Sequence, residues 1–145
     1  MAHIRQLIRD RVISTLTGLN TTGSNVFGVR VYPMNEASLP GIIVYTETES
    51  TEYITTSLPR TQMRTLTVSA EAYVRASSDY EDTLDTIAAE IEAAIYNDVT
   101  LNGLAKDSRI ISFETGFSGE AEQPVITGTF IIEVVYTSTE GTPTG

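Results

Sequence analysis

The chain has no cysteine and only one histidine, His3. The absence of cysteine excludes disulfides, thiolate catalysis and cysteine-ligated metal sites. Any Ser-His-Asp arrangement would have to use His3, which lies two residues from the start of the chain, where positions are poorly fixed. A residue at the beginning of a helix is therefore the favoured interpretation of His3.

Basic residues and long apolar runs are also scarce. Nine Lys and Arg stand against 19 Asp and Glu, for a net charge of −10. A protein that grips nucleic-acid phosphates needs a basic face, so this chain has at most a local basic patch. An acidic surface instead repels DNA, which helps if DNA must pass without sticking. The chain has no run of about 18 apolar residues, so no membrane-spanning helix is predicted. The start of the chain is amphipathic, which is not typical of a signal peptide.

What is present is the composition of a folded domain. The 145 residues are 41% hydrophobic, which suffices for one domain with a buried core. Residues 138–145 contain no apolar anchor. We therefore expect a single domain over residues 1–137 and a flexible C-terminal tail over residues 138–145.

Two segments have the apolar spacing of amphipathic helices. The first covers residues 3–17 and stops before Gly18. The second ends near Asn97 and begins at Ser78-Asp79-Tyr80-Glu81, which has the form of a capping box. The apolar stripes are Ile4, Leu7, Ile8, Val12 and Leu16 in the first, and Leu84, Ile87, Ala88, Ile91 and Ile95 in the second.

Five further segments predict strands: residues 26–32, 39–46, 63–75, 109–117 and 125–137. Residues 63–75 alternate between apolar and polar side chains, which indicates a sheet covered by helices on one side only. The predicted fold is α+β, in the order α-β-β-β-α-β-β. It has a single mixed, mainly antiparallel sheet of about five strands, with two helices packed on one face.

A long polar stretch, residues 47–60, separates two of these strands and is predicted to be a contact loop that is mobile until assembly. Its charges either pair within the loop or make complementary contacts between subunits. Aromatic and apolar side chains inside it are candidate anchors for a partner. The predicted contact residues, toward another subunit or a tube, are Glu47, Glu49, Glu52, Tyr53, Ile54, Arg60 and Arg64.

Few residues suggest chemistry. The acidic group Asp79, Glu81, Asp82 and Asp85 has the spacing to share a cation, but no histidine or second acidic group completes a site, and a solvated helix face explains it. The glycine-containing turns lack the lysine of a phosphate-binding loop. We expect no catalytic, cofactor-binding or metal site.

The order of the segments resembles the phage tail terminator family, the minor tail protein U-like proteins of lambdoid siphophages. The resemblance covers most of the chain and lies in its layout together with scattered residues. The similar segments are the opening Arg-containing helix, residues 26–27, 39–45, 64–68, 85–92, 101–104 and 129–132, and Tyr136.

The resemblance implies a non-enzymatic virion protein, assembled in the host cytoplasm and placed at the head-proximal end of the tail. It implies a hexameric ring that caps the tail tube protein, stops its polymerisation and offers a surface to a head completion or connector protein. DNA would pass through without specific binding, and Glu120 and Glu122 are candidate lumen residues beside Glu47, Glu49 and Glu52. The alternatives are another head–tail connector or a tail tube protein, or a small carboxylate-based enzyme or ligand-binding domain.

Overall fold

The computed structural model describes residues 2–28, 39–76, 79–118 and 125–144. Its elements follow the predicted order of helices and strands. They are α1 (Ile4–Leu16), β1 (Val26–Phe27), β2 (Gly41–Tyr53), β3 (Thr61–Arg75), α2 (Tyr80–Tyr96), β4 (Asp107–Ser118) and β5 (Val125–Thr139). Ser78 of the predicted capping box lies outside the described residues, and the side chain of the N-cap residue Asp79 makes no capping hydrogen bond.

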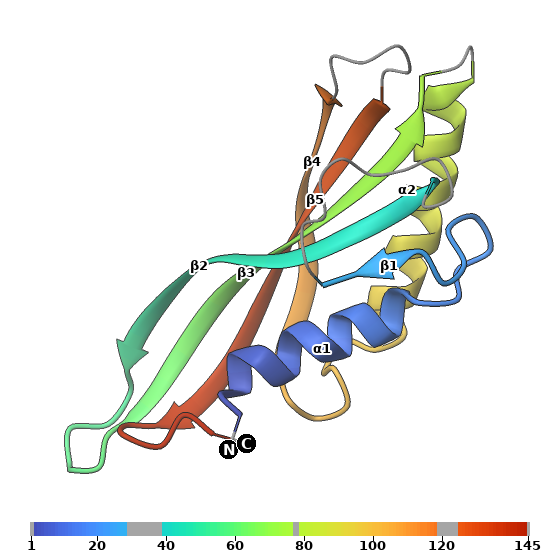
Figure 1. Cartoon of the computed structure of the whole chain (residues 1–145). Coiled ribbons are helices and arrows are strands. Elements are labelled where there is room, and N and C mark those ends of the chain that lie inside the picture. The colour runs from blue at the N-terminus through green and yellow to red at the C-terminus, as the bar shows by residue number, and fades with distance from the viewer. Residues whose placement is uncertain (1, 29–38, 77–78, 119–124, 145) are drawn as a thin grey trace.

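The strands form one twisted sheet in the order β1-β2-β3-β5-β4 (Figure 1). β1 pairs with β2 in parallel, and every other pairing is antiparallel. β3 and β5 are paired along their whole lengths, from Thr61 opposite Thr139 to Arg75 opposite Val125. The predicted mixed, mainly antiparallel sheet is thus confirmed.

Both helices pack on the same face of the sheet and bury the stripes that the sequence predicts. α1 contributes Ile8, Val12 and Leu16 to the core, and α2 contributes Leu84, Ile87, Ile91 and Ile95. β3 supplies every second residue from Leu66 to Val74 to this core, because alternate side chains of a strand point to one face. Hydrophobic burial between the two layers is therefore the main source of stability.

The face of the sheet opposite the helices is polar in β3, yet much of it is buried. Ser69, Glu71 and Tyr73 are all below one tenth exposed. The Tyr45 hydroxyl donates to the Glu71 carboxylate, and so does the Tyr73 hydroxyl at 2.8 Å. These hydrogen bonds offset the cost of removing the carboxylate from water. Burial, followed by the bond to Glu71, raises the pKa of Tyr45 to about 12.

The prediction of a loop over residues 47–60 is wrong for most of this range. β2 continues to Tyr53 and β3 begins at Thr61, so that only residues 54–60 form the turn. The extra pairs run from Thr48 opposite Thr67 to Tyr53 opposite Gln62. Threonine favours strands, which is consistent with the observed pairing. The sequence was interpreted as a loop because its residues are polar, and they are polar because this hairpin has little apolar surface to bury. We call the paired ends of β2 and β3 with their turn, residues 47–65, the arm.

The arm extends past the helix-covered part of the sheet, and its turn lies at one end of the molecule (Figure 1). The C-terminal residues run beside it. Ser138 and Thr139, where the tail was expected to begin, are the last residues of β5. The amide of Glu140 donates to the carbonyl of Arg60 at 2.8 Å, and the amide of Ile4 donates to the carbonyl of Pro143 at 2.8 Å. The flexibility of residues 138–145 stays a prediction.

Replacing Ile91 by alanine tests the two-layer core. Ile91 is fully buried between α2 and the sheet, and truncating such a side chain costs about 2–5 kcal/mol of unfolding free energy. Asp85→Ala, at an exposed position of the same helix, should change it by less than about 0.5 kcal/mol. Urea denaturation followed by circular dichroism measures both, and equal stability of the two variants would contradict this packing.

Candidate functional site

The base of the arm contains a buried ionic cluster centred on Glu49. One carboxylate oxygen, Oε1, accepts from Arg64 at 2.9 Å and from Arg5 of α1 at 3.0 Å. The other, Oε2, accepts from the Tyr136 hydroxyl of β5 at 2.5 Å. The Glu49 side chain is only 8% exposed and that of Arg64 13%. One carboxylate therefore joins α1, β2, β3 and β5.

Arg64 makes further hydrogen bonds within the cluster. Arg64 donates through Nε to the Ser138 hydroxyl at 3.0 Å and through a terminal nitrogen to the Gln62 side-chain oxygen at 2.9 Å. Burial, with the hydrogen bond to Glu49, raises the pKa of Tyr136 above its usual value. We call Arg5, Glu49, Gln62, Arg64, Tyr136 and Ser138 the Glu49 cluster. Because these hydrogen bonds connect α1 with three strands, the cluster acts as a structural joint.

The structure places the seven predicted contact residues in two groups. Glu49 and Arg64 are enclosed in the Glu49 cluster, and Glu47 accepts from the Ser69 hydroxyl at 2.6 Å. Their contacts are thus with neighbouring strands of the same chain, because strand pairing brings together residues far apart in sequence. Contact of these three residues with another subunit stays a prediction. Glu120 and Glu122 lie outside the described residues.

Of the other predicted residues, Tyr53, Ile54 and Arg60 lie at the turn of the arm, and Glu52 is exposed near the end of β2. Tyr53 is 53% exposed and Ile54 50%, and the Arg60 guanidinium lies 5.1 Å from the centre of the Tyr53 ring. Arg60 also lies 3.2 Å from a carboxylate oxygen of Glu140. Leu58 is 74% exposed and was missed, although an apolar residue before Pro59 in a polar stretch was a usable signal. We call Tyr53, Ile54 and Leu58 the tip.

The single histidine caps α1. The Nδ1 atom of His3 accepts from the Arg5 amide at 3.0 Å, which is the role of an N-cap acceptor. Partial burial, together with the positive charges of Arg5 and Arg64, lowers the pKa of His3 below 6.5. A neutral imidazole at this position is therefore a structural cap.

The described part of the chain holds no grouping that indicates metal or membrane chemistry. Among those residues, no three His, Cys, Asp or Glu side chains are close enough to hold a metal ion. Glu81, Asp82 and Asp85 of the predicted acidic group are exposed on α2. No helix among the described residues is long and apolar enough to cross a membrane.

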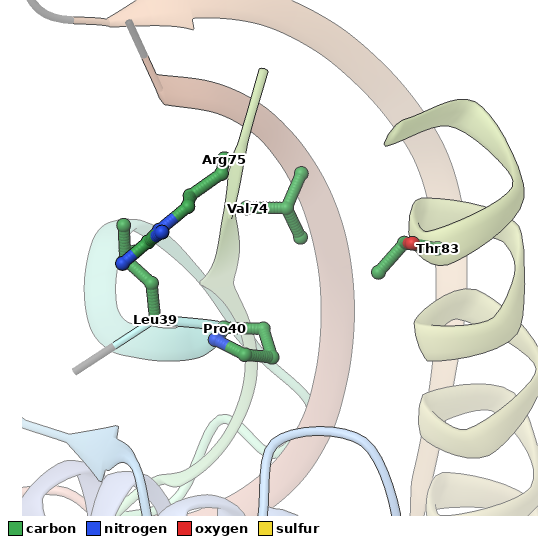
Figure 2. Close-up of a pocket in the computed structure, with 5 residues that line it drawn as sticks. All are labelled: Leu39, Pro40, Val74, Arg75 and Thr83. Carbon is green, nitrogen blue, oxygen red and sulfur yellow. The ribbon is translucent and has the colours of Figure 1, made fainter. Parts of the chain in front are cut away.

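Among the described residues, a cleft of about 370 Å³ is lined by Ile4, Gly103, Leu104, Ala105, Lys106 and Thr137, and two further clefts adjoin α2. One lies between the start of β2, the end of β3 and α2, has a volume of about 240 Å³, and is lined by Leu39, Pro40, Val74, Arg75 and Thr83 (Figure 2). Those residues supply one cation and one hydroxyl but no carboxylate or imidazole, so they offer no acid–base pair. The other cleft, of about 230 Å³, lies between α2 and β4 and is mainly apolar; its lining includes Glu92, Ile95, Tyr96, Val99, Arg109 and Ile110.

Comparison with known proteins gives only weak structural likenesses, one of which is described below. No family model matches the chain, and no curated protein matches it. A chain from the virion of a native gene transfer agent particle is similar in structure, with 15% sequence identity, 92% of each chain covered and a TM-score of 0.38. A likeness at this level carries no argument about the role of the chain.

Removing the carboxylate of Glu49 should destabilise the fold. In Glu49→Ala, Arg64 is left buried without its anion, which costs about 3 kcal/mol; this is the low end of the range for a broken buried pair because Arg5 is partly exposed. Glu52→Ala, at an exposed position of the same strand, should stay within about 0.5 kcal/mol of the original chain. Urea denaturation compares the two, and a neutral Glu49→Ala would contradict the role of the cluster.

The pKa of His3 is directly measurable, because its imidazole gives the single histidine signal in an NMR titration. We expect a value below 6.5, and a higher value in Arg5→Gln, which removes one of the nearby positive charges. The pKa of His3 is lower in the folded state than in the unfolded state. The contribution of this cap to stability is therefore fully present above the unfolded-state pKa, and it is lost as the pH falls through the folded-state pKa. An unshifted or raised pKa would contradict the capping geometry.

Proposed function

We propose that this chain is a structural virion protein, a tail terminator that forms a ring at the end of the tail tube. The observation that carries the proposal is the arm. A two-layer domain of ordinary size holds a stiff hairpin beyond its core and exposes three large apolar side chains at the tip. Exposed apolar groups at a projecting end are typical of protein contact sites.

Two further points support this function. The order of elements is the one that the resemblance to the tail terminator family implies. The described residues also offer no convergent nucleophile, base and cleft, because His3 is used as a cap and the acidic group of α2 is spread over an exposed helix face. Both points favour an assembly role over the carboxylate-based enzyme.

The mechanism is geometric. Identical subunits that contact head to tail close into a ring when the rotation between them closes, here with six copies. One face of the ring matches the end of the stacked tube subunits. The opposite face lacks the surface for adding another tube subunit, so growth stops and a head completion or connector protein can bind there.

An acidic ring also suits the passage of DNA. With a charge of −10 per chain, a subunit gains no counterion release from duplex DNA and repels it. The candidate lumen residues Glu120 and Glu122 lie outside the described residues, so this part of the proposal rests on the net charge of the chain. A ring whose hole is lined by lysine and arginine would contradict this part of the proposal.

Electron microscopy combined with a tube growth assay tests the function. We expect rings with a central hole in the purified chain or at the ends of tubes, and we expect added chain to shorten tubes grown from the tail tube protein of the same phage. A tube protein would instead polymerise into filaments by itself, and a connector would leave tube length unchanged. Either result would overturn the terminator assignment.

A further inference from the structure

Six large hydrophobic side chains of the described residues are exposed, and they lie in two regions of the fold. Three form the tip of the arm. The other three are Tyr96, Ile111 and Phe113, which are 78%, 49% and 43% exposed. We call these three the edge patch, since they come from the end of α2 and from β4, the edge strand of the sheet. Two such patches on one small domain indicate two contact surfaces.

The edge patch lies beside the apolar cleft between α2 and β4. Tyr96 and Ile110 line this cleft, and Ile111 follows at the irregularity in the pairing of β4 with β5, between Ile110 and Ser112. Phe113 packs against Phe130 with 4.8 Å between ring centres. Phe113 is not among the residues that line the cleft, whereas the exposed Tyr96 is. The cleft is thus a mainly apolar concave surface with one exposed aromatic ring in its lining, which suits insertion of a small apolar segment.

The tip and the edge patch do not cover each other within one chain. β2 and β4 are on opposite sides of the sheet, separated by β3 and β5. The tip also lies at the far end of the arm, away from α2 (Figure 1). A contact between the two patches therefore requires a second molecule.

We infer that the tip of one copy inserts into the cleft beside Tyr96 of the next copy. A second copy is the occupant that uses both patches of every subunit once, which is the condition for a head-to-tail ring. The charges are also complementary. Glu52 is an exposed carboxylate beside the tip, and Arg109 lines the cleft with a side chain that is 66% exposed, although it pairs with Glu133 at 2.8 Å within the chain. Glu52 of one copy can therefore approach the open side of Arg109 of the next copy. The inference rests on the proposed ring and names its contact.

Cysteine cross-linking tests this contact cleanly, because the chain has no cysteine of its own. Leu58→Cys and Tyr96→Cys are made as separate variants, mixed, oxidised and run on a non-reducing gel. We expect a covalent dimer in which mass spectrometry finds a disulfide between position 58 of one chain and position 96 of another. The matched control pairs Leu58→Cys with Glu81→Cys, an exposed position at the other end of α2, and should give little product.

The outcomes separate this contact from the function. Rings seen by electron microscopy without the expected cross-link would overturn the contact and leave the terminator proposal standing. Cross-linking of Leu58→Cys to a tail tube protein in assembled tails, and not to Tyr96→Cys, would assign the tip to the tube and also overturn it. A mixture that stays monomeric and unlinked at about 1 mM, where binding would be weaker than about −4 kcal/mol, and that also gives no rings and no cross-link at the ends of tubes would count against both.

A second variant measures the apolar contribution. Leu58→Ser removes the most exposed apolar side chain of the tip and should weaken subunit association about tenfold or more, since burying a leucine is worth more than the free energy of a tenfold change. Ser57→Ala, at the neighbouring position, is the control and should leave association unchanged. Sedimentation velocity measures association, and circular dichroism checks that both variants fold. Unchanged association of Leu58→Ser would overturn the insertion.

Discussion

The carboxylate of Glu49 is the interaction on which the shape of this protein depends. It lies where the hydrophobic core ends and the uncovered part of the sheet begins, and it accepts from two arginines and a tyrosine. Along most of the sheet, burial against α1 and α2 holds the layers together. At the base of the arm an ionic cluster that includes the core residue Tyr136 adds to this burial, and it joins the first turn of α1 to three strands.

This joint gives the arm its direction. Its strands are paired with each other, and β3 is also paired with β5 as far as Thr139. The side chains at the turn are therefore presented at a fixed position relative to the core. A preorganised projection loses less conformational entropy on binding than a disordered loop does, so that a small apolar tip suffices for a contact repeated around an assembly.

The helices and most strand positions were predictable from the sequence, whereas the arm was not. In α2 buried residues recur four positions apart, at Ile87, Ile91 and Ile95, because one face of the helix packs on the sheet. In β3 every second residue from Leu66 to Val74 belongs to the core, as at Leu66, Val68 and Ala70, because one face of the strand packs on the helices. Residues 47–53 have no buried apolar face, so their sequence shows no alternation of apolar and polar residues that would indicate a strand. The Glu49 cluster was not predictable, because Arg5, Glu49 and Tyr136 meet only through strand register. Tyr53 and Ile54 were predicted to be contact residues from their chemistry, and they are exposed at the turn; their contact with a partner stays a prediction. Leu58 was overlooked.

The pairing of residues near the two ends of the chain gives the fold a nearly circular topology. His3 and Thr144 form a backbone bridge, and the Ile4 amide donates to the Pro143 carbonyl. A short linker joining these ends, with the chain reopened at the exposed turn around Asn102 and Gly103, would retain every strand pairing while beginning with β4 and β5. The observed order of elements is thus one of several circular permutations that are compatible with this fold. A circularly permuted protein would have the same sheet, arm and edge patch.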